Sequence, residues 1–201
     1  MTYSYKTIIN PIENIDFKEK GSKFIGFAYP VDDEDDIKKR LAELWGRFPD
    51  ATHICYAFRV GMNGDFYRAN DDGEPSGSAG FPIYNQIVSH EITNVLVASV
   101  RFYGGTKLGV SGLIKAYKLS AQMVLEEAEI VEKHLKEKIL FEFSYEDQGS
   151  VMRNVDKGNA EVVSTEFTTS CKLIVKIRKD QRDKFLALFD PLYQVKITNL
   201  N

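Results

Sequence analysis

The sequence has few of the features that mark extracellular, membrane or metal-binding proteins. Its two cysteines, Cys55 and Cys171, lie far apart and form neither a CxxC pair nor a Cys/His cluster at metal-ligand spacing. No apolar run approaches the roughly 20 residues that cross a bilayer. Residues 1–10 also lack the basic and apolar regions of a secretory signal. We therefore expect reduced thiols, no cofactor, no membrane partner and a soluble cytoplasmic protein.

The chain also lacks a strong charge of either sign. Its 26 Lys and Arg residues nearly balance its 29 Asp and Glu residues, and the formal net charge is −3. Proteins that bind nucleic acid through their overall charge are strongly basic, so any such site here must be a local basic patch. Hydrophobic residues make up 43% of the 201 positions, enough for one large core or two small ones.

The last third of the chain has the clearest pattern of secondary structure. Predicted strands cover residues 138–145, 160–167, 170–178 and 193–198. Predicted helices cover residues 148–156 and 180–189, and Asp180 is expected to cap the second of them. The order βαββαβ predicts a ferredoxin-like domain, in which two helices cover one face of a four-stranded antiparallel sheet. We place this domain at residues 135–201.

Residues 1–134 follow a different pattern, which predicts a second α+β domain. Predicted strands cover residues 23–29, 53–60, 65–68, 93–102 and 129–134. One predicted helix begins within the acidic residues 32–36. Two more predicted helices cover residues 82–89 and 111–127. Two glycine-rich loops, residues 69–80 and 104–112, connect strands to helices, and such loops often carry function.

The first of these loops carries three carboxylates and two hydroxyls. Asp71, Asp72 and Glu74 can bind a divalent cation or act as an acid and base pair. Ser76 and Ser78 are potential nucleophiles. The alternative is structural: the acids and serines cap turns and the following helix, and the glycines permit positive φ.

The second loop has the features of an anion site. Arg101, Gly104, Gly105, Lys107 and Lys115 lie where a strand ends and a helix begins. Free backbone N–H groups and the positive end of the helix dipole favour an anion there. The sequence does not match GxxxxGK[ST], so a nucleotide P-loop is not indicated. A ligand-free turn that lets a helix pack closely on a sheet is the alternative.

Two further groups have simple structural explanations. His53 and Cys55 are two residues apart on a predicted strand, so their side chains face the same way and are expected to be packing residues. Lys18, Lys20 and Lys23 are expected to form a solvated edge. Lys23 joins the candidate site only if this edge lies beside the second loop.

Taken together, these segments resemble the IMPACT (YigZ-type) protein family in its short bacterial form. The resemblance is carried by Lys20-Gly21-Ser22-Lys23-Phe24-Ile25, by His53 with Cys55-Tyr56-Ala57-Phe58-Arg59, and by residues 71–82 and 101–117. It implies that residues 1–134 adopt the fold of the second domain of ribosomal protein S5, followed by the ferredoxin-like domain. Both folds also resemble later domains of elongation factor G, which act on ribosomal RNA.

The resemblance implies a translation-associated regulator that binds RNA or the ribosome. In such a protein we expect the two loops to meet, with the acidic loop holding Arg101, Lys107 and Lys115 in position. Two alternatives stay open. The glycine-rich loops can serve a small-molecule or nucleotide-dependent enzyme, because a superfamily of kinases shares the S5-type fold. Exposed strand edges can also serve a protein–protein adaptor.

Overall fold

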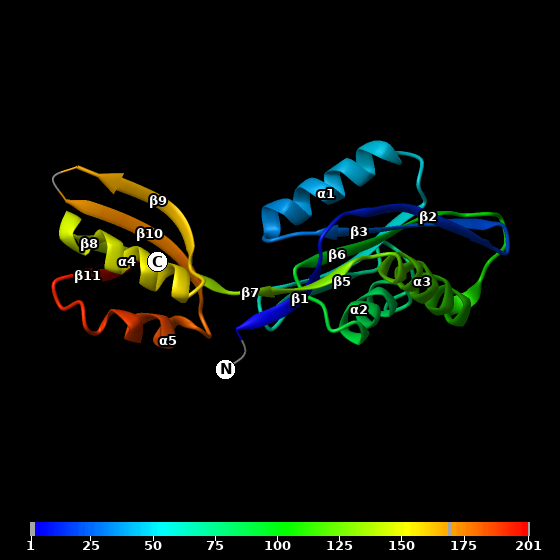
Figure 1. Ribbon diagram of the computed structural model, residues 1–201. Helices are drawn as coiled ribbons and strands as arrows, with labels where there is room; N and C mark the ends of the chain where they lie inside the picture. Colours follow the sequence, from blue (N-terminus) through cyan, green and yellow to red (C-terminus); the bar gives the residue numbers. More distant parts are fainter. Residues whose placement is uncertain (1–2, 169, 201) are drawn as a thin grey trace. The chain divides into compact units, whose positions relative to one another are not determined.

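A computed structural model describes residues 3–168 and 170–200 and divides the chain into two compact units. The first unit covers Ser4–Lys133, and the second contains Tyr3 and residues 134–200. Both units mix helices with antiparallel sheets, as expected for the α+β class (Figure 1). Whether residues 135–201 fold by themselves stays a prediction. None of the helices in the described residues combines the length and apolar character that a bilayer crossing requires.

The first unit is built on a five-stranded sheet with the order β2-β3-β6-β4-β5. Its strands are β2 (Ile12–Glu19), β3 (Ser22–Pro30), β4 (His53–Val60), β5 (Phe66–Asn70) and β6 (Val95–Phe102). Strands β1 (Ser4–Ile8) and β7 (Ile130–His134) pair in a separate two-stranded sheet. The helices are α1 (Glu34–Arg47), α2 (Gly80–Ser89) and α3 (Gly109–Glu126).

Helix α1 covers one face of the larger sheet, and α2 and α3 cover the other (Figure 1). The central strand β6 contributes alternate residues to the two cores, as the two-residue period of a strand requires. Leu96 and Val100 pack with α1, whereas Val97 packs with α2 and α3. Ser99 also faces α3, where its hydroxyl lies 2.7 Å from that of Ser120. The same alternation places Arg101 on the α2/α3 face, at the end of the strand.

The second unit has the predicted βαββαβ order. Its elements are β8 (Lys136–Phe143), α4 (Gln148–Lys157), β9 (Glu161–Phe167), β10 (Cys171–Arg178), α5 (Arg182–Leu186) and β11 (Lys196–Leu200). Two single 3₁₀ turns, η1 (Tyr145–Asp147) and η2 (Ala187–Phe189), adjoin α4 and α5. The strands pair antiparallel in the order β11-β8-β10-β9. Both helices pack on one face of this sheet through a core that includes Phe141, Val155 and Phe185.

Several predicted boundaries differ from the structure. Strands β1 and β2 were not predicted, and β2 carries a register shift at its start and Asn14 at φ 62°, which breaks its alternation. Both glycine-rich loops are shorter than expected, because α2 begins at Gly80 and α3 at Gly109. Asp180 does not cap the last helix: its carboxylate accepts two hydrogen bonds from Arg178, and Gln181 occupies the cap position.

Candidate functional site

The two glycine-rich loops meet at a cavity of about 450 Å³ in the first unit. Antiparallel pairing sets His53 of β4 directly opposite Arg101 of β6, and both side chains line the cavity. Glu74 and Pro75 contribute from the first loop. The complete lining is Thr52, His53, Glu74, Pro75, Arg101, Tyr103, Lys107, Leu108, Gly109, Val110 and Leu113. The structure therefore brings part of each predicted loop to one place.

A buried ion pair lies at this site. Arg101 Nη1 donates to Glu74 Oε1 at 2.5 Å, and the two side chains are only 6% and 4% exposed. The hydroxyl of Tyr117 donates to the same oxygen at 2.8 Å, and Arg101 Nη2 donates to Ser22 Oγ at 3.2 Å. A buried charge requires such partners, and removing one of them is costly. Glu74 of the acidic loop therefore holds Arg101, as expected from the sequence, and burial makes Arg101 a structural residue of the site. A role of Arg101 in binding phosphate stays a prediction.

Asp71 ties the first loop to the start of α2. Its carboxylate accepts hydrogen bonds from the N–H groups of Gly77, Ala79 and Gly80 at 2.8–2.9 Å. Partial burial by itself would raise the pKa of Asp71, but the three donors outweigh it and hold that pKa below its usual range. The structural interpretation of this acid therefore fits better than metal binding. In the part of the chain that is described, no group of three His, Cys, Asp or Glu side chains is placed to hold a metal ion.

Asp72 orients His53 toward the cavity. Its backbone has φ 45°, and its carboxylate accepts the N–H of Ile54 at 2.6 Å. Its carbonyl oxygen lies 2.6 Å from His53 Nδ1. Because a carbonyl can only accept, we assign the hydrogen to Nδ1, which leaves the lone pair of a neutral imidazole on Nε2. His53 Nε2 lies 3.9 Å from Glu74 Oε1, and the side chain is 22% exposed. His53 thus belongs to the site, although its position on an alternating strand had indicated packing alone.

Cys55 does not form a nucleophilic pair with His53. The thiol is fully buried and donates to the carbonyl oxygen of Asp71 at 3.0 Å. Burial is the main cause that raises the pKa of the Cys55 thiol well above its usual range, and the nearby Tyr117 hydroxyl lowers it by less. A thiolate is the reactive form of cysteine, so this residue fits the expected packing role.

The predicted lysines do not form the expected network with the acids. Lys107 is exposed and lines the cavity, whereas Lys115 lines a neighbouring hollow of about 290 Å³ together with Lys20. Lys23 pairs with Asp16 at 3.2 Å instead of reaching the cavity. Within the described residues neither Lys107 nor Lys115 has a salt bridge. The expectation that the acidic loop holds these lysines is therefore wrong.

The reason is that the acidic side chains of the loop already have partners. Asp71 and Asp72 accept backbone N–H groups, and Glu74 is paired with Arg101. Ser76 is exposed and lies outside the cavity lining. Ser78 is fully buried, and its hydroxyl has no hydrogen-bond partner among the described residues.

The glycines of the second loop serve close packing more than anion binding. A Cβ atom on Gly104 would overlap the backbone of Gly21, and the N–H of Gly104 already donates to Ser22 Oγ at 3.2 Å. Gly105 has φ 87°, and a Cβ there would meet open space as far as the described residues extend. A close crossing at Gly104 and a left-handed backbone at Gly105 explain this pair of glycines.

The family model described as the Impact N-terminal domain matches residues 20–125, which include the whole cavity lining. The chain belongs to the IMPACT family. It is 35% identical over 135 residues to the IMPACT family member YvyE of Bacillus subtilis, a match that covers 67% of this chain and 62% of that protein. It is 29% identical over 171 residues to an IMPACT family member of Haemophilus influenzae, with 83% and 82% covered.

Two further comparisons extend this result. IMPACT family member YigZ of Escherichia coli is 36% identical over 100 residues, or 49% of each chain. A solved structure described as a crystal structure of an hypothetical protein superposes with a TM-score of 0.72 at 22% identity, and covers 100% of this chain and 99% of its own. That structure shows the shared fold. Because the matched segments span 62% of YvyE and 49% of YigZ, whole-protein activity stays a matter for proposal.

Proposed function

We propose that this IMPACT family protein is a translation-associated regulator that binds single-stranded RNA, free or on the ribosome, through the cavity in its first unit. The observation that carries the proposal is the composition of that cavity. Apolar walls from Pro75, Leu108, Val110 and Leu113 lie beside two rings, those of His53 and Tyr103. Sequence-tolerant RNA binding uses aromatic rings on which bases stack, next to cations that contact the backbone. RNA as the partner also suits the cytoplasmic location expected from the sequence.

Tyr103 is the side chain best placed to stack on a base. It follows the last residue of β6 and is 46% exposed, yet its N–H is fixed by Thr52 Oγ1 at 2.9 Å. The guanidinium of Arg101 lies over this ring, 5.5 Å from its centre, a cation–π contact that favours one position of the ring. An exposed ring held by its neighbours loses little conformational entropy when a base stacks on it.

The start of α3 supplies the phosphate contacts. Lys107 precedes the helix, and no described side chain caps the free N–H groups that follow Leu108. Unsatisfied N–H groups and the helix dipole favour an anion at this end of an 18-residue helix. Lys115 and Lys20, which line the adjacent hollow, extend the positive charge along the proposed path of the RNA.

Fluorescence anisotropy with a labelled uridine oligonucleotide of about a dozen nucleotides tests the proposal. Tyr103→Ala is expected to weaken binding by about tenfold, which lies within the 1–3 kcal/mol of one stacked base. Lys107→Ala is expected to lower the slope of log K against log salt by about 0.7, the value for one lost phosphate contact. Lys157→Ala, an exposed lysine of α4 in the second unit, is the matched control. Identical curves for all four proteins would favour the adaptor alternative.

A nucleotide-dependent enzyme is a second candidate, and the orientation of His53 favours it. The carbonyl oxygen of Asp72 occupies Nδ1, so Nε2 keeps the lone pair that a general base needs, on a ring that lines the cavity. Such an enzyme should bind ATP saturably and require a divalent cation. Calorimetric titration of wild type and His53→Ala with ATP and Mg²⁺ separates the two candidates. Saturable, Mg²⁺-dependent ATP binding by wild type would favour the enzyme, and a general base at His53 predicts that His53→Ala keeps this binding but loses turnover.

We also propose named folds for the two units. The second unit is a ferredoxin-like domain, which its βαββαβ order and its β11-β8-β10-β9 sheet support. The first unit corresponds to the second domain of ribosomal protein S5, for which the family membership is the support. Circular dichroism and cooperative unfolding of a fragment of residues 135–201 test the proposed boundary, and a fragment without a cooperative transition would contradict it.

A further inference from the structure

The sheet of the second unit has one face that its helices do not cover. Odd-numbered residues of β8 and β10, such as Phe141 and Val175, pack beneath α4 and α5. Even-numbered residues of the same strands therefore face the opposite way. Leu140 and Ile174 lie near the middle of this second face and are only half-buried. The remaining positions on its two central strands are all charged.

At one end of this face, like charges stand directly opposite each other. The register of β8 and β10 pairs Lys138 with Lys176 and Lys136 with Arg178. Residues opposite one another in an antiparallel pair have Cβ atoms about 5 Å apart, and like charges there destabilise the sheet. We call these four residues the basic cluster. The two adjacent pairs place four cations side by side on the central strands.

At the other end of the same face, residues of opposite charge stand across from each other. There Lys172 of β10 stands opposite Glu142 of β8, and Lys196 of β11 stands opposite the same glutamate. The amines lie 3.9 Å and 3.1 Å from its carboxylate oxygens. Opposite charges are therefore paired at one end, and like charges are concentrated at the other.

Neighbouring acids neutralise only part of the basic cluster. Lys136 Nζ lies 2.7 Å from Glu161, which also stands opposite Lys176 in the register of β9 and β10. Arg178 binds Asp180 with two nitrogens. Lys138 forms no salt bridge with any residue that the structure describes. Net positive charge therefore remains where β8 and β10 meet.

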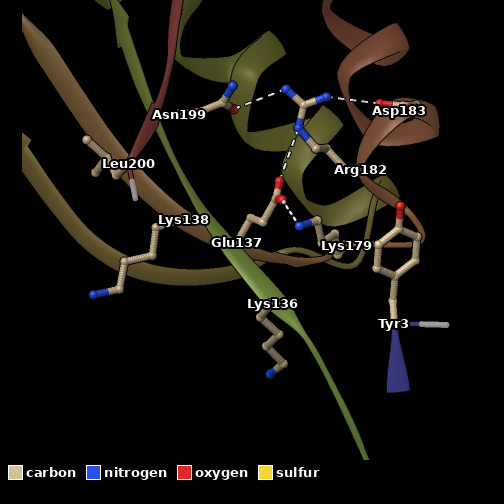
Figure 2. A pocket seen from close by; sticks show the side chains of 9 residues that line it. All are labelled: Tyr3, Lys136, Glu137, Lys138, Lys179, Arg182, Asp183, Asn199 and Leu200. Carbon is tan, nitrogen blue, oxygen red and sulfur yellow. Dashed lines mark hydrogen bonds and ion pairs between the residues drawn. The ribbon is translucent and has the colours of Figure 1, made fainter. Parts of the chain in front are cut away.

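The cluster borders an open hollow of about 670 Å³, which Lys136, Lys138 and Leu200 help to line (Figure 2). Figure 2 shows the two amines pointing away from Glu137, whose carboxylate binds Lys179 and Arg182 instead. The three guanidinium nitrogens of Arg182 contact Glu137, Asp183 and Asn199. Three of the five N–H donors of Arg182 are thus engaged within the unit, and its charge is shared with Glu137 and Asp183. Lys138 is the cation of this lining that has no salt bridge among the described residues.

We propose that the basic cluster binds the phosphate backbone of RNA, as a second contact separate from the cavity of the first unit. A small phosphate ion needs fixed, converging donors, and the guanidinium of Arg182 is already engaged with Glu137 and Asp183. Flexible amines distributed over two strands suit a polyanion that supplies several phosphates and releases counterions on binding. The described residues of β8 and β10 on this face include no aromatic ring on which a base could stack, so the contact is independent of sequence. The choice of RNA as the ligand rests on the proposed function. The basic cluster itself is an observation of the strand register and does not depend on that proposal.

The test compares four full-length proteins for binding to polyuridylate across a salt series. They are wild type, Lys138→Gln with Lys176→Gln, the cavity variant Tyr103→Ala with Lys107→Ala, and a control. The control is Lys157→Gln with Lys184→Gln, which removes equal charge from exposed positions on α4 and α5. The cluster variant is expected to lower the slope of log K against log salt by about 1.4, or two contacts at 0.7 each. It is expected to melt no lower than wild type, because an unfavourable pair is removed.

The outcomes separate the two proposals. If only the cluster variant loses affinity, the inference holds and the cavity proposal fails. If only the cavity variant loses affinity, or if the cluster variant matches its control, the inference is overturned. Binding of polyglutamate as strong as that of polyuridylate would also overturn it, because an acidic protein would then be an equal occupant.

Discussion

The buried pair of Arg101 and Glu74 allows the sharpest test of how the site is held together. Replacing one member leaves the other as an uncompensated charge, because the two side chains are 6% and 4% exposed. Breaking a buried pair in this way typically costs about 3–5 kcal/mol. Tyr117 would still donate to a lone Glu74, and Ser22 would still accept from a lone Arg101. Those neutral partners do not replace an opposite charge, so we expect Arg101→Met and Glu74→Leu each to fall in that range.

The double variant Arg101→Met with Glu74→Leu shows whether the cost of each single change comes from the unpaired charge or from lost packing. Replacing both members of a buried pair by apolar residues of similar volume is often nearly neutral. We therefore expect Arg101→Met with Glu74→Leu to cost less than either single variant. Additive costs would show that the two side chains act independently, which would refute the reasoning, as would a cost below about 1 kcal/mol for either single change.

Urea unfolding followed by the fluorescence of Trp45 is the appropriate assay. Trp45 is the single tryptophan of the chain and lies on α1, in the first unit. A local probe is needed because two units can unfold in separate transitions. An unchanged m value would show that each substitution alters stability and not the surface exposed on unfolding.

Three further predictions concern other parts of the fold. Asp71→Asn should destabilise the first unit by about 1.5–3 kcal/mol near neutral pH, because charge-assisted bonds to three N–H groups are weakened. The folded pKa of Asp71 is held below its ordinary value of 3.8, so this contribution is fully present above that value and is lost as pH falls through the folded pKa. Urea titrations near neutrality and at about pH 3 should show the difference from wild type shrinking in acid. Gly104→Ala should cost more than about 2 kcal/mol through the overlap with Gly21, whereas Gly149→Ala on α4, where a Cβ meets open space within the described residues, should be neutral or stabilising. Lys138→Glu should stabilise the second unit by about 0.2–1 kcal/mol in thermal unfolding, because it converts a like-charge pair with Lys176 into an opposite one.

The periodic parts of the fold were predictable because one physical signal dominates in each. Strand β4 was placed at residues 53–60 and α4 at residues 148–156, close to their observed bounds. Their apolar residues face a core at a regular spacing, and that spacing can be recognised in the sequence without knowledge of tertiary contacts. Strand β2 lacked that signal, because it lies at the edge of its sheet, interrupts its pairing and buries no residue fully.

The candidate site was predictable at the level of segments and not at the level of side chains. The glycines and acids indicated that the two loops matter, and the structure places both at one cavity. Which acidic side chain pairs with which cationic side chain depended on strand register, and no local sequence pattern reveals that register. Register sets His53 opposite Arg101 and brings Glu74 within reach, whereas backbone N–H groups occupy Asp71. The alternation of His53 with Cys55 was the one sequence feature that bore on the position of His53. Alternation shows which side of a strand a residue faces, but not whether that side is a cavity wall or a packed core.

The two groups of cations have opposite structural roles, which explains why composition alone is a poor guide to binding in this protein. In the first unit Arg101, one of the cations expected from the sequence to favour an anion, is buried in an ion pair with Glu74. In the second unit Lys138 and Lys176 belong to no recognisable motif, yet the register sets them against each other on an open sheet. A chain of net charge −3 can therefore retain a local preference for phosphates, because what matters is where cations lack partners and not how many there are. If both surfaces contact one RNA, the salt slopes of the cavity and cluster variants should add in the combined variant, since each contact releases its own counterions.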